Sequence, residues 1–309
     1  IPVFVDVKPG TYIIDPDKIE PMITKKTRAL MIPSLMGNIP DLIKLKKIAD
    51  KYDLWIIEDS CDTLGAKFAG KPTGQYTDIS VTSFYASHII TAAGGGGMAC
   101  FNDKNMARRA RVISSWGRES TNFGFHEKSE NLDKRFSGRI EGRVYDAKFI
   151  FSEVGYNFQV PEMFGAFGLE QLKKFPKFAQ RRKKNFKEML SFFKKYDRYF
   201  ILPKQTDKSE TNWLAFPLTI KPGAGFSRHE ITKYLEENGI QTRPVFTGNA
   251  LKQPAFKNLI RGGARKMSCP VADDVTLNGF VIGCHHGLKK PDTSYVKRKF
   301  EQFLGEYAE

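Results

Sequence analysis

Short apolar runs alternate with an amphipathic stretch near the start of the chain. Residues 27–33 (TRALMIP) and 54–58 (LWIIE) have the length and composition of buried strands. Between them, residues 40–52 predict a helix with Pro40 in its first turn, where a missing N–H is tolerated. A strand, a helix and a strand in succession form a crossover unit, which predicts a parallel sheet covered by helices.

The pattern continues through the next hundred or so positions, a span typical of one domain. Residues 78–85 and 98–102 predict two further strands, and residues 105–116 predict a helix. Residues 117–147 are polar and punctuated by glycine, with little periodicity. This segment is therefore expected to be a long functional loop.

A long helical pattern then links two parts of the chain. Residues 161–196 carry Leu, Phe, Lys and Arg at helical spacing, and Pro176 predicts a break there. Beyond them, strands and helices, one of them with a capping box from Ser227 to Glu230, predict a compact α+β unit. These elements are expected at residues 212–220, 227–238, 240–245 and 297–307. A chain of 309 residues favours two unequal domains. We expect a large α/β domain over 1–160, linking helices over 161–197 and a small domain over 198–309.

The net charge of the chain indicates which kinds of molecule it could bind. The chain has 49 Lys and Arg against 34 Asp and Glu, a formal net charge of +15. Many of these cations fall on predicted helix faces, and no nucleic-acid motif is present, so an anionic small molecule explains the charge as well as DNA does. No apolar run approaches the roughly 18 residues that span a bilayer, and the first residues lack a signal-peptide pattern. We therefore expect a cytoplasmic protein that binds neither nucleic acid nor membrane.

Polar side chains follow the ends of two predicted strands. Asp59 ends the first, Ser83 ends the second, and Ser87 and His88 precede the glycine run 94–97. Open parallel sheets bind ligands at the carboxyl ends of their strands, where a carboxylate can pair with a pyridinium nitrogen and a hydroxyl with a phosphate. Taken singly, a strand-end acid is more often a turn or cap residue, a histidine a satisfied polar group and a glycine cluster an empty loop. Their order and spacing make the set specific.

Several longer segments carry a resemblance to a known family. The chain from Val3 to Leu304 resembles the DegT-type sugar aminotransferases, which are pyridoxal-phosphate enzymes of fold type I, and among them the deoxysugar 3-dehydratases. The segments are EDSCDTLGAKFAGKPTG, SFYASHIITAAGGGG, VGYNFQVPEMFGAFGLEQLKKFPKF, TNWLAFPLTIKPGAGFSRHEI and IQTRPVFTGNALKQPAF. The resemblance implies a cofactor-binding large domain over residues 1–160. It also implies that the family fold has an N-terminal part absent from this chain, with a phosphate loop and a stacking aromatic, so the phosphate site here is expected to be incomplete.

The resemblance assigns roles to individual residues. His88 stands where the aminotransferases have the lysine that bonds to the cofactor aldehyde; an imidazole moves protons but forms no stable imine. Asp59 would pair with the pyridine nitrogen, and Ser83 would hold the cofactor phosphate. Asn157 would reach the phosphate in the neighbouring subunit of a homodimer with shared active sites, and Asp62 falls at the position that touches the cofactor 3-oxygen. Substrate contacts are expected from Ser87, Arg118 and Arg243.

The cysteines separate two branches that share the histidine. The branch acting on a CDP-sugar holds an iron–sulfur cluster on cysteines that follow a Trp-Gly-Arg motif. Here Trp116-Gly117-Arg118 is followed by Glu-Ser-Thr-Asn, and no cysteine occurs between Arg118 and Cys269. Such a cluster requires thiolate ligands. We therefore expect no iron–sulfur cluster and no metal, as in the GDP-4-keto-6-deoxymannose 3-dehydratase branch.

The reaction implied is a 3-dehydration of a nucleotide-linked 4-keto-6-deoxyhexose. Pyridoxal or pyridoxamine phosphate would be the cofactor, glutamate the amino donor and His88 the base, in the synthesis of a deoxysugar for lipopolysaccharide O-antigen. The residues leave open which nucleotide and which sugar are used. Three alternatives remain: a sugar 4-aminotransferase using another lysine, such as Lys67 or Lys71, an iron–sulfur-type relative that lost its cluster, and an inactive binding homologue.

Overall fold

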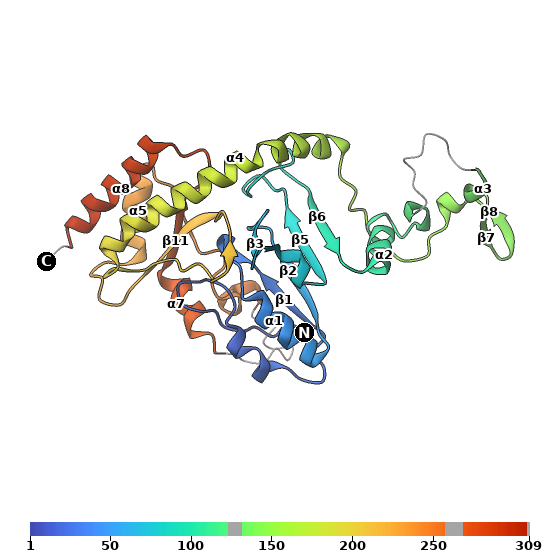
Figure 1. The fold of residues 1–309 in the computed structure, drawn as a ribbon, viewed down its shortest axis with the longest axis horizontal. Helices are drawn as coiled ribbons and strands as arrows, with labels where there is room; N and C mark the ends of the chain where they lie inside the picture. Colours follow the sequence, from blue (N-terminus) through green and yellow to red (C-terminus); the bar gives the residue numbers. More distant parts are fainter. Residues whose placement is uncertain (123–131, 257–267, 308–309) are drawn as a thin grey trace.

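The computed structural model describes residues 1–122, 132–256 and 268–307. Two sheets lie beneath one long helix, α4 (Glu162–Phe193), and a smaller segment projects from one end of the molecule (Figure 1). Two clusters of buried apolar side chains form the core, one around each sheet. The predicted α/β class is confirmed.

The first sheet has the order β1-β2-β5-β6. Strands β1 (Ala29–Pro33), β2 (Trp55–Asp59) and β5 (Ile79–Ser83) are parallel, and β6 (Gly97–Phe101) runs antiparallel to β5. Helix α1 (Leu42–Tyr52) connects β1 to β2, as the pattern predicts for a crossover unit. The sheet is therefore mainly parallel, with its carboxyl ends at a single edge.

Helix α1 covers one face of this sheet. Its residues Leu42, Leu45, Ile48 and Ala49 are buried with Ile32 and Ile56 of the strands. The start predicted at Pro40 is wrong: Asp41 is the N-cap and accepts a hydrogen bond from Lys44 N, so the helix begins at Leu42. On the opposite face Met31 and Trp55 are 65% and 48% exposed.

The segment after α2 (Lys104–Ser114) is more regular than predicted. The loop expected over 117–147 contains a 3-10 turn, a helix and a hairpin, and residues 123–131 lie outside the described chain. The elements are η5 (Glu119–Asn122), α3 (Leu132–Arg135), β7 (Gly138–Ile140) and β8 (Arg143–Tyr145). Glu141 and Gly142 both have positive φ, as a tight two-residue hairpin turn requires, and the hairpin projects from the body (Figure 1).

Helix α4 runs unbroken through Pro176, so the predicted break is wrong. Losing one backbone hydrogen bond and accommodating the ring costs about 3 kcal/mol in a helix interior. Packing on both sides of the proline offsets this cost. Phe175 lies against Gly65 beside the first sheet, whereas Phe186, Met189 and Phe193 are buried in the second core. The helix thus spans both sheets.

The second sheet is antiparallel, with the order β12-β13-β11-β9. Its strands are β9 (Phe200–Ile201), β11 (Ala215–Ile220), β12 (Thr242–Pro244) and β13 (Gly279–Gly283). Helices α5 (Arg228–Glu237), α7 (Pro270–Asn278) and α8 (Lys290–Gly305) accompany them. The capping box from Ser227 to Glu230 is confirmed. The last helix begins at Lys290 rather than residue 297, with Pro291 in its first turn, and the sequence pattern missed α7 and β13.

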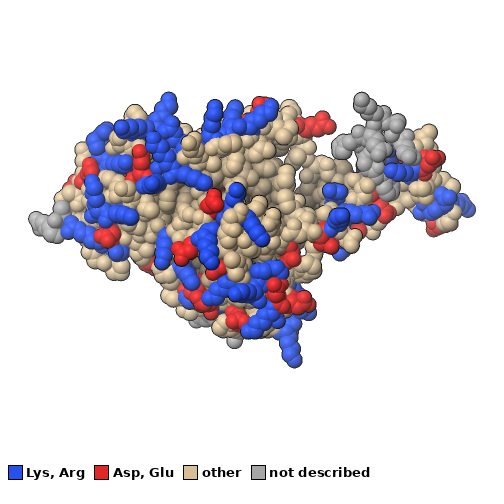
Figure 2. Space-filling view, viewed as in Figure 1, with Lys and Arg blue, Asp and Glu red and all other residues tan. Residues whose placement is uncertain are grey.

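The remaining short strands, β3 (Lys67–Phe68), β4 (Lys71–Pro72) and β10 (Ser209–Glu210), form a small sheet that joins residues after β2 to residues before β11. Figure 2 shows Lys and Arg gathered over α4. Lys173, Lys177 and Arg181 of this helix are exposed. Among the described helices, none is both long enough and apolar enough to cross a membrane.

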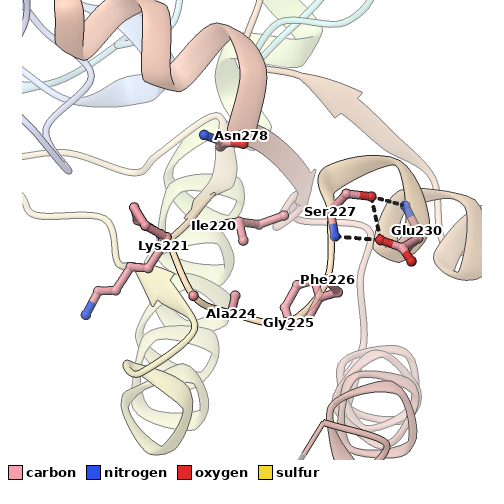
Figure 3. A pocket seen from close by; sticks show the side chains of 10 residues that line it. Ile220, Lys221, Ala224, Gly225, Phe226, Ser227, Glu230 and Asn278 are labelled. Carbon is pink, nitrogen blue, oxygen red and sulfur yellow. Dashed lines mark hydrogen bonds between the residues drawn. The ribbon is translucent and has the colours of Figure 1, made fainter.

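A cavity of about 330 Å³ lies beside α5, and Figure 3 shows the side chains that line it. It is lined by the loop at residues 220–227 and by Glu230 and Asn278. The Glu230 carboxylate is already occupied by the backbone and hydroxyl of Ser227. None of the predicted site residues lines this cavity, so the chemistry must be sought elsewhere.

Candidate active site

The carboxyl edge of the first sheet brings three chain segments together. Pro33, Asp59 and Val81 are neighbours in the parallel register, so the turns after β1, β2 and β5 leave the sheet side by side. Backbone hydrogen bonds extend this register into the turns, from Ser34 N to Asp59 O at 2.8 Å and from Ser60 N to Val81 O at 2.8 Å. This edge is where open parallel sheets bind ligands.

His88 lies in the turn between β5 and β6. Its backbone N–H donates to Tyr85 O at 3.0 Å, and the next two residues, Ile89 and Ile90, are buried and anchor the turn. The glycine run closes the turn, with Phe84 N donating to Gly96 O. At Gly94 and Gly96 φ is positive, a conformation that glycine adopts without strain. The imidazole is thereby held at the sheet edge with part of its surface exposed.

Asp62 is the carboxylate nearest to His88. Its Oδ1 lies 3.4 Å from Nδ1 of His88, and the two side chains are 6% and 19% exposed. The two atoms do not form a hydrogen bond in this arrangement, and this buried nitrogen has no other described hydrogen-bond partner. The other carboxylate oxygen, Oδ2, accepts a hydrogen bond from Met36 N at 2.9 Å. A carboxylate and an imidazole are therefore paired at the predicted catalytic position.

Asp59 and Ser83 occupy the ends of their strands, as predicted. Asp59 is half-buried, and its Oδ1 accepts from Cys61 N at 3.1 Å, the turn contact that any strand-end acid can make. The hydroxyl oxygen of Ser83 accepts from Tyr85 N at 3.1 Å, which leaves its proton free to donate. Both side chains thus retain capacity for a ligand at this edge.

Glu58 precedes Asp59 and points to the opposite face of the sheet, because successive strand residues alternate. It is 1% exposed; Ser34 Oγ donates to its Oε1 at 3.4 Å, while its Oε2 has no described partner. Burial raises the pKa of Glu58 to about 7, against the weaker opposing effect of nearby hydroxyls. This carboxyl therefore takes no direct part in ligand binding but titrates near neutral pH.

We expect Glu58→Gln to stabilise the protein at alkaline pH. The folded state holds the Glu58 proton more tightly than the unfolded chain, so wild-type stability falls as pH rises from the unfolded pKa to the folded pKa of about 7. The neutral amide removes that loss, worth about 3 kcal/mol at most. Thermal melting should show the variant gaining on the wild type between pH 5 and pH 8. An unchanged difference across this range would contradict the prediction.

Within the described residues, three predicted site residues, Asn157, Arg118 and Arg243, have no contact with the residues at this edge. Asn157 is exposed and its Oδ1 accepts from Gln159 N. The Arg118 guanidinium lies 4.8 Å from the Trp116 ring and 5.5 Å from the Phe151 ring, and its Nε is buried without a described hydrogen bond. Arg243 lies on β12 of the second sheet, where it donates to Thr242 O. Ser87 is exposed beside His88.

Sequence reasoning missed the turn after β1. Met36 supplies the amide that holds Asp62, and its backbone adopts a positive φ of 60°. No motif indicated this contact, because its donor is a backbone N–H, which every residue except proline has. The pairing of Asp62 with His88 was also not predicted, since the resemblance assigned Asp62 to the cofactor.

Known proteins similar to this chain include several sugar-modifying enzymes. The lipopolysaccharide biosynthesis protein RfbH of Salmonella typhimurium is 36% identical over 307 residues, covering 99% of this chain and 69% of that protein. The dTDP-4-dehydro-2,6-dideoxy-D-glucose 3-dehydratase of Saccharopolyspora spinosa is 32% identical, covering 98% and 65%. The GDP-4-keto-6-deoxy-D-mannose 3-dehydratase of Yersinia pseudotuberculosis is 34% identical over 255 residues, covering 81% and 60%. The chain therefore spans between 60% and 69% of the length of these relatives.

Solved structures similar to this chain include proteins of the same named class as these relatives. The GDP-4-keto-6-deoxy-D-mannose-3-dehydratase of E. coli with bound hydrated PLP has a TM-score of 0.82 and 27% identity, over 96% of this chain and 73% of that chain. A histidine-to-asparagine variant of GDP-4-keto-6-deoxymannose-3-dehydratase with bound GDP-perosamine has the same TM-score and identity, over 96% and 74%. An aminotransferase from Psychrobacter cryohalolentis, at 22% identity and a TM-score of 0.85, shares the fold.

The family model of the DegT/DnrJ/EryC1/StrS aminotransferases matches residues 1–301. The match includes both sheets, α4 and the edge that carries Asp59, Asp62, Ser83 and His88. With the mainly parallel sheet and the solved neighbours, it shows that this chain belongs to the DegT/DnrJ/EryC1/StrS aminotransferase family.

Proposed function

We propose that the protein catalyses the pyridoxal-phosphate-dependent 3-dehydration of a nucleotide-linked 4-keto-6-deoxyhexose, with glutamate as amino donor. The observation that carries this proposal is His88 at the carboxyl edge of the sheet, where the resemblance expects a lysine. Several of the similar proteins are named 3-dehydratases, and RfbH is named for lipopolysaccharide biosynthesis. The nearby lysines Lys67 and Lys71 lie in the β3–β4 hairpin, and both are exposed.

The side chains at the edge fit the cofactor chemically. Asp59 offers a half-buried carboxylate for a protonated ring nitrogen, and Ser83 offers a free hydroxyl proton for a phosphate. His88 offers a partly exposed imidazole. When bound, pyridoxal phosphate supplies an electron sink that eases loss of a proton from an attached carbon. A carboxylate, a hydroxyl and a base on adjacent turns form the donor set that this group requires.

The overall reaction balances with glutamate as the reductant. Replacing the C3 hydroxyl by hydrogen is a net two-electron reduction of the sugar. Glutamate supplies those electrons and leaves as 2-oxoglutarate, so the sugar and glutamate yield the 3-deoxy-4-keto sugar, 2-oxoglutarate and ammonia. In this scheme Nε2 of His88 accepts the proton that is lost from the carbon attached to the cofactor. His88 then donates a proton to the C3 hydroxyl of the sugar, which leaves as water. Because His88 forms no covalent bond to the cofactor, no internal amine competes with the elimination.

A second copy of the chain would complete the site. Asn157 is proposed to reach the cofactor phosphate of the neighbouring subunit of a homodimer. Around it, Tyr156, Phe158 and Val160 are 62%, 68% and 53% exposed. Contiguous exposed apolar side chains of this kind typically mark an interaction surface. Arg118 and Arg243 are proposed to hold the carboxylate of glutamate or the sugar substrate, and Ser87 to contact the sugar.

A product assay tests the proposed function. The full-length protein, incubated with pyridoxal phosphate, glutamate and a panel of nucleotide-linked 4-keto-6-deoxy sugars, should release a 3-deoxy-4-keto sugar, identified by its mass. Ammonia and 2-oxoglutarate should form in equal amounts. A product that has gained an amine while keeping its C3 hydroxyl would make the protein a sugar 4-aminotransferase instead. No product from any sugar would favour a binding homologue.

We also predict that protein purified without oxygen contains no stoichiometric iron or acid-labile sulfide and turns over without a reductase. The sequence has no cysteine between Arg118 and Cys269, whereas a cluster of this kind is held by thiolates. Elemental analysis and a sulfide assay on active protein check this. A cluster whose removal abolishes turnover would place the protein in the iron–sulfur branch.

A further inference from the structure

We propose that Asp62 is a positioning residue that fixes the ring orientation and tautomer of His88. This inference rests on the proposed function for its catalytic meaning, but the pairing itself is a property of the protein alone. Oδ1 of Asp62 lies 3.4 Å from Nδ1 of His88, and no other described acid lies within 4.0 Å of the imidazole. A small rotation of the ring converts this approach into a hydrogen bond. The proton of the neutral ring then resides on Nδ1, and Nε2 is left as the proton acceptor.

Asp62 is itself held in a fixed orientation. The residue is 5% exposed, and its Oδ2 accepts from Met36 N at 2.9 Å. Met36 is buried and adopts a left-handed backbone conformation, which costs a residue with a side chain roughly 1–2 kcal/mol. Such a conformation persists only where the surroundings enforce it. Here it directs the amide of Met36 toward the carboxylate.

The Met36 turn is tied to the segment that leads into β11 of the second sheet. Met36 O accepts from Leu214 N at 2.9 Å, and Nη1 of the buried Arg182 on α4 donates to Leu214 O at 2.9 Å. Thr211 Oγ1 also donates to Gly37 O. The orientation of Asp62 thus depends on contacts from both parts of the chain, which gives it the rigidity that a positioning residue needs.

The proposed hydrogen bond to Asp62 would also satisfy the buried Nδ1 of His88. Nδ1 of His88 is buried and has no described hydrogen bond, and Tyr85 packs edge-on to the ring with centroids 6.4 Å apart. A buried polar nitrogen without a partner is costly, and the carboxylate is the acceptor within reach. A charged acceptor makes the stronger hydrogen bond. The pairing with Asp62 therefore sets which ring nitrogen faces the ligand side.

An Asp62→Asn substitution separates this role from simple packing. The Met36 amide requires an acceptor, so the Asn oxygen takes the position of Oδ2 and the Asn NH2 group faces His88. An NH2 group can only donate to Nδ1, which places the ring proton on Nε2 and removes the base from the ligand side. The substitution keeps the shape of the side chain, so the tautomer is the property that changes.

The test is long-range 1H–15N NMR of protein labelled with 15N-histidine, without cofactor. The chain has five histidines, and the His88 signals are those absent from the His88→Asn spectrum. We expect the wild type to show the Nδ1–H form of His88 and Asp62→Asn to show the Nε2–H form. Asp50→Asn, on the exposed side of α1, is the matched control and should leave the spectrum unchanged. A wild-type His88 in the Nε2–H form, or an Asp62→Asn tautomer like the wild type, would overturn the proposal without depending on any variant's activity.

Kinetics then connect the pairing to turnover. In the product assay, Asp62→Asn should lower kcat by about a hundredfold to ten-thousandfold with a smaller change in KM, because substrate binding is not the property affected. A changed tautomer with kcat retained would overturn the positioning role. A changed tautomer in a protein whose wild type dehydrates no sugar would support the pairing and overturn only the proposed reaction.

Discussion

Replacing His88 by asparagine is expected to slow dehydration of the sugar by about two to four orders of magnitude, the usual effect of removing a general base. Asparagine keeps a polar side chain of similar size but cannot accept and return a proton near neutral pH. Cofactor affinity, which we assign to Asp59, Ser83 and Asn157, should change little. Rates with saturating sugar and glutamate, together with cofactor binding measured by absorbance, check both parts.

A matched control is His229→Asn, because His229 is exposed on α5, the helix that packs against β12 and β13 of the second sheet. It should retain the wild-type rate. Glutamate conversion to 2-oxoglutarate also moves a proton at the cofactor carbon, so His88→Asn should slow this half-reaction as well. A His88→Asn protein that dehydrates the sugar at the native rate would mean that the base lies elsewhere.

His88→Lys gives the complementary result. A lysine amine at this position can bond to the cofactor aldehyde, so borohydride should trap the cofactor covalently on the variant. The wild type should release its cofactor after the same treatment. Dehydration should be lost in the variant, with some amine transfer to C4 gained. A borohydride adduct on any lysine of the wild-type protein would contradict the dehydratase assignment.

Gly37→Ala is expected to lower the free energy of unfolding by about 3 kcal/mol. Gly37 has a φ of +93°, and a Cβ there would lie 2.5 Å from Trp213 Cα and 2.6 Å from Leu214 N. Both are backbone atoms, which cannot rotate away as a side chain would. The turn and residues 213–214 would have to separate, and Met36 and its contact to Asp62 would move with them. Thermal melting should show Tm lower by roughly 5 °C.

Gly70→Ala is the control for backbone strain alone. Gly70 has a φ of +79°, but a Cβ there would meet nothing within 4 Å. This variant should lose about 1 kcal/mol, the cost of the left-handed conformation without a clash. If Gly37→Ala melts no lower than Gly70→Ala, the close approach between the turn and residues 213–214 is not maintained in solution.

The local sequence pattern was sufficient for most of the first sheet. The apolar runs that became β1 and β2, the amphipathic run that became α1 and the capping box of α5 all carry their signal within a few residues. Errors arose where distant contacts override local preference. Pro176 predicts a break, yet α4 continues because packing on both sides holds it. Hairpin β7–β8 was missed because strands of three residues carry little periodicity.

The candidate active site also has a part that the sequence predicts and a part that only the structure shows. The sequence alone placed Asp59 and Ser83 at strand ends and His88 in the glycine-closed turn, because strand ends, glycines and chemical type can be read directly from residues. Only the tertiary structure decided that Asp62 faces His88 and is held by the Met36 amide. Those contacts join the turns that follow β1, β2 and β5. Their geometry depends on the register of the sheet and on the positive φ of Met36, which the sequence does not indicate. Local patterns determine where a strand ends, whereas the packing of separate segments determines which side chains meet there.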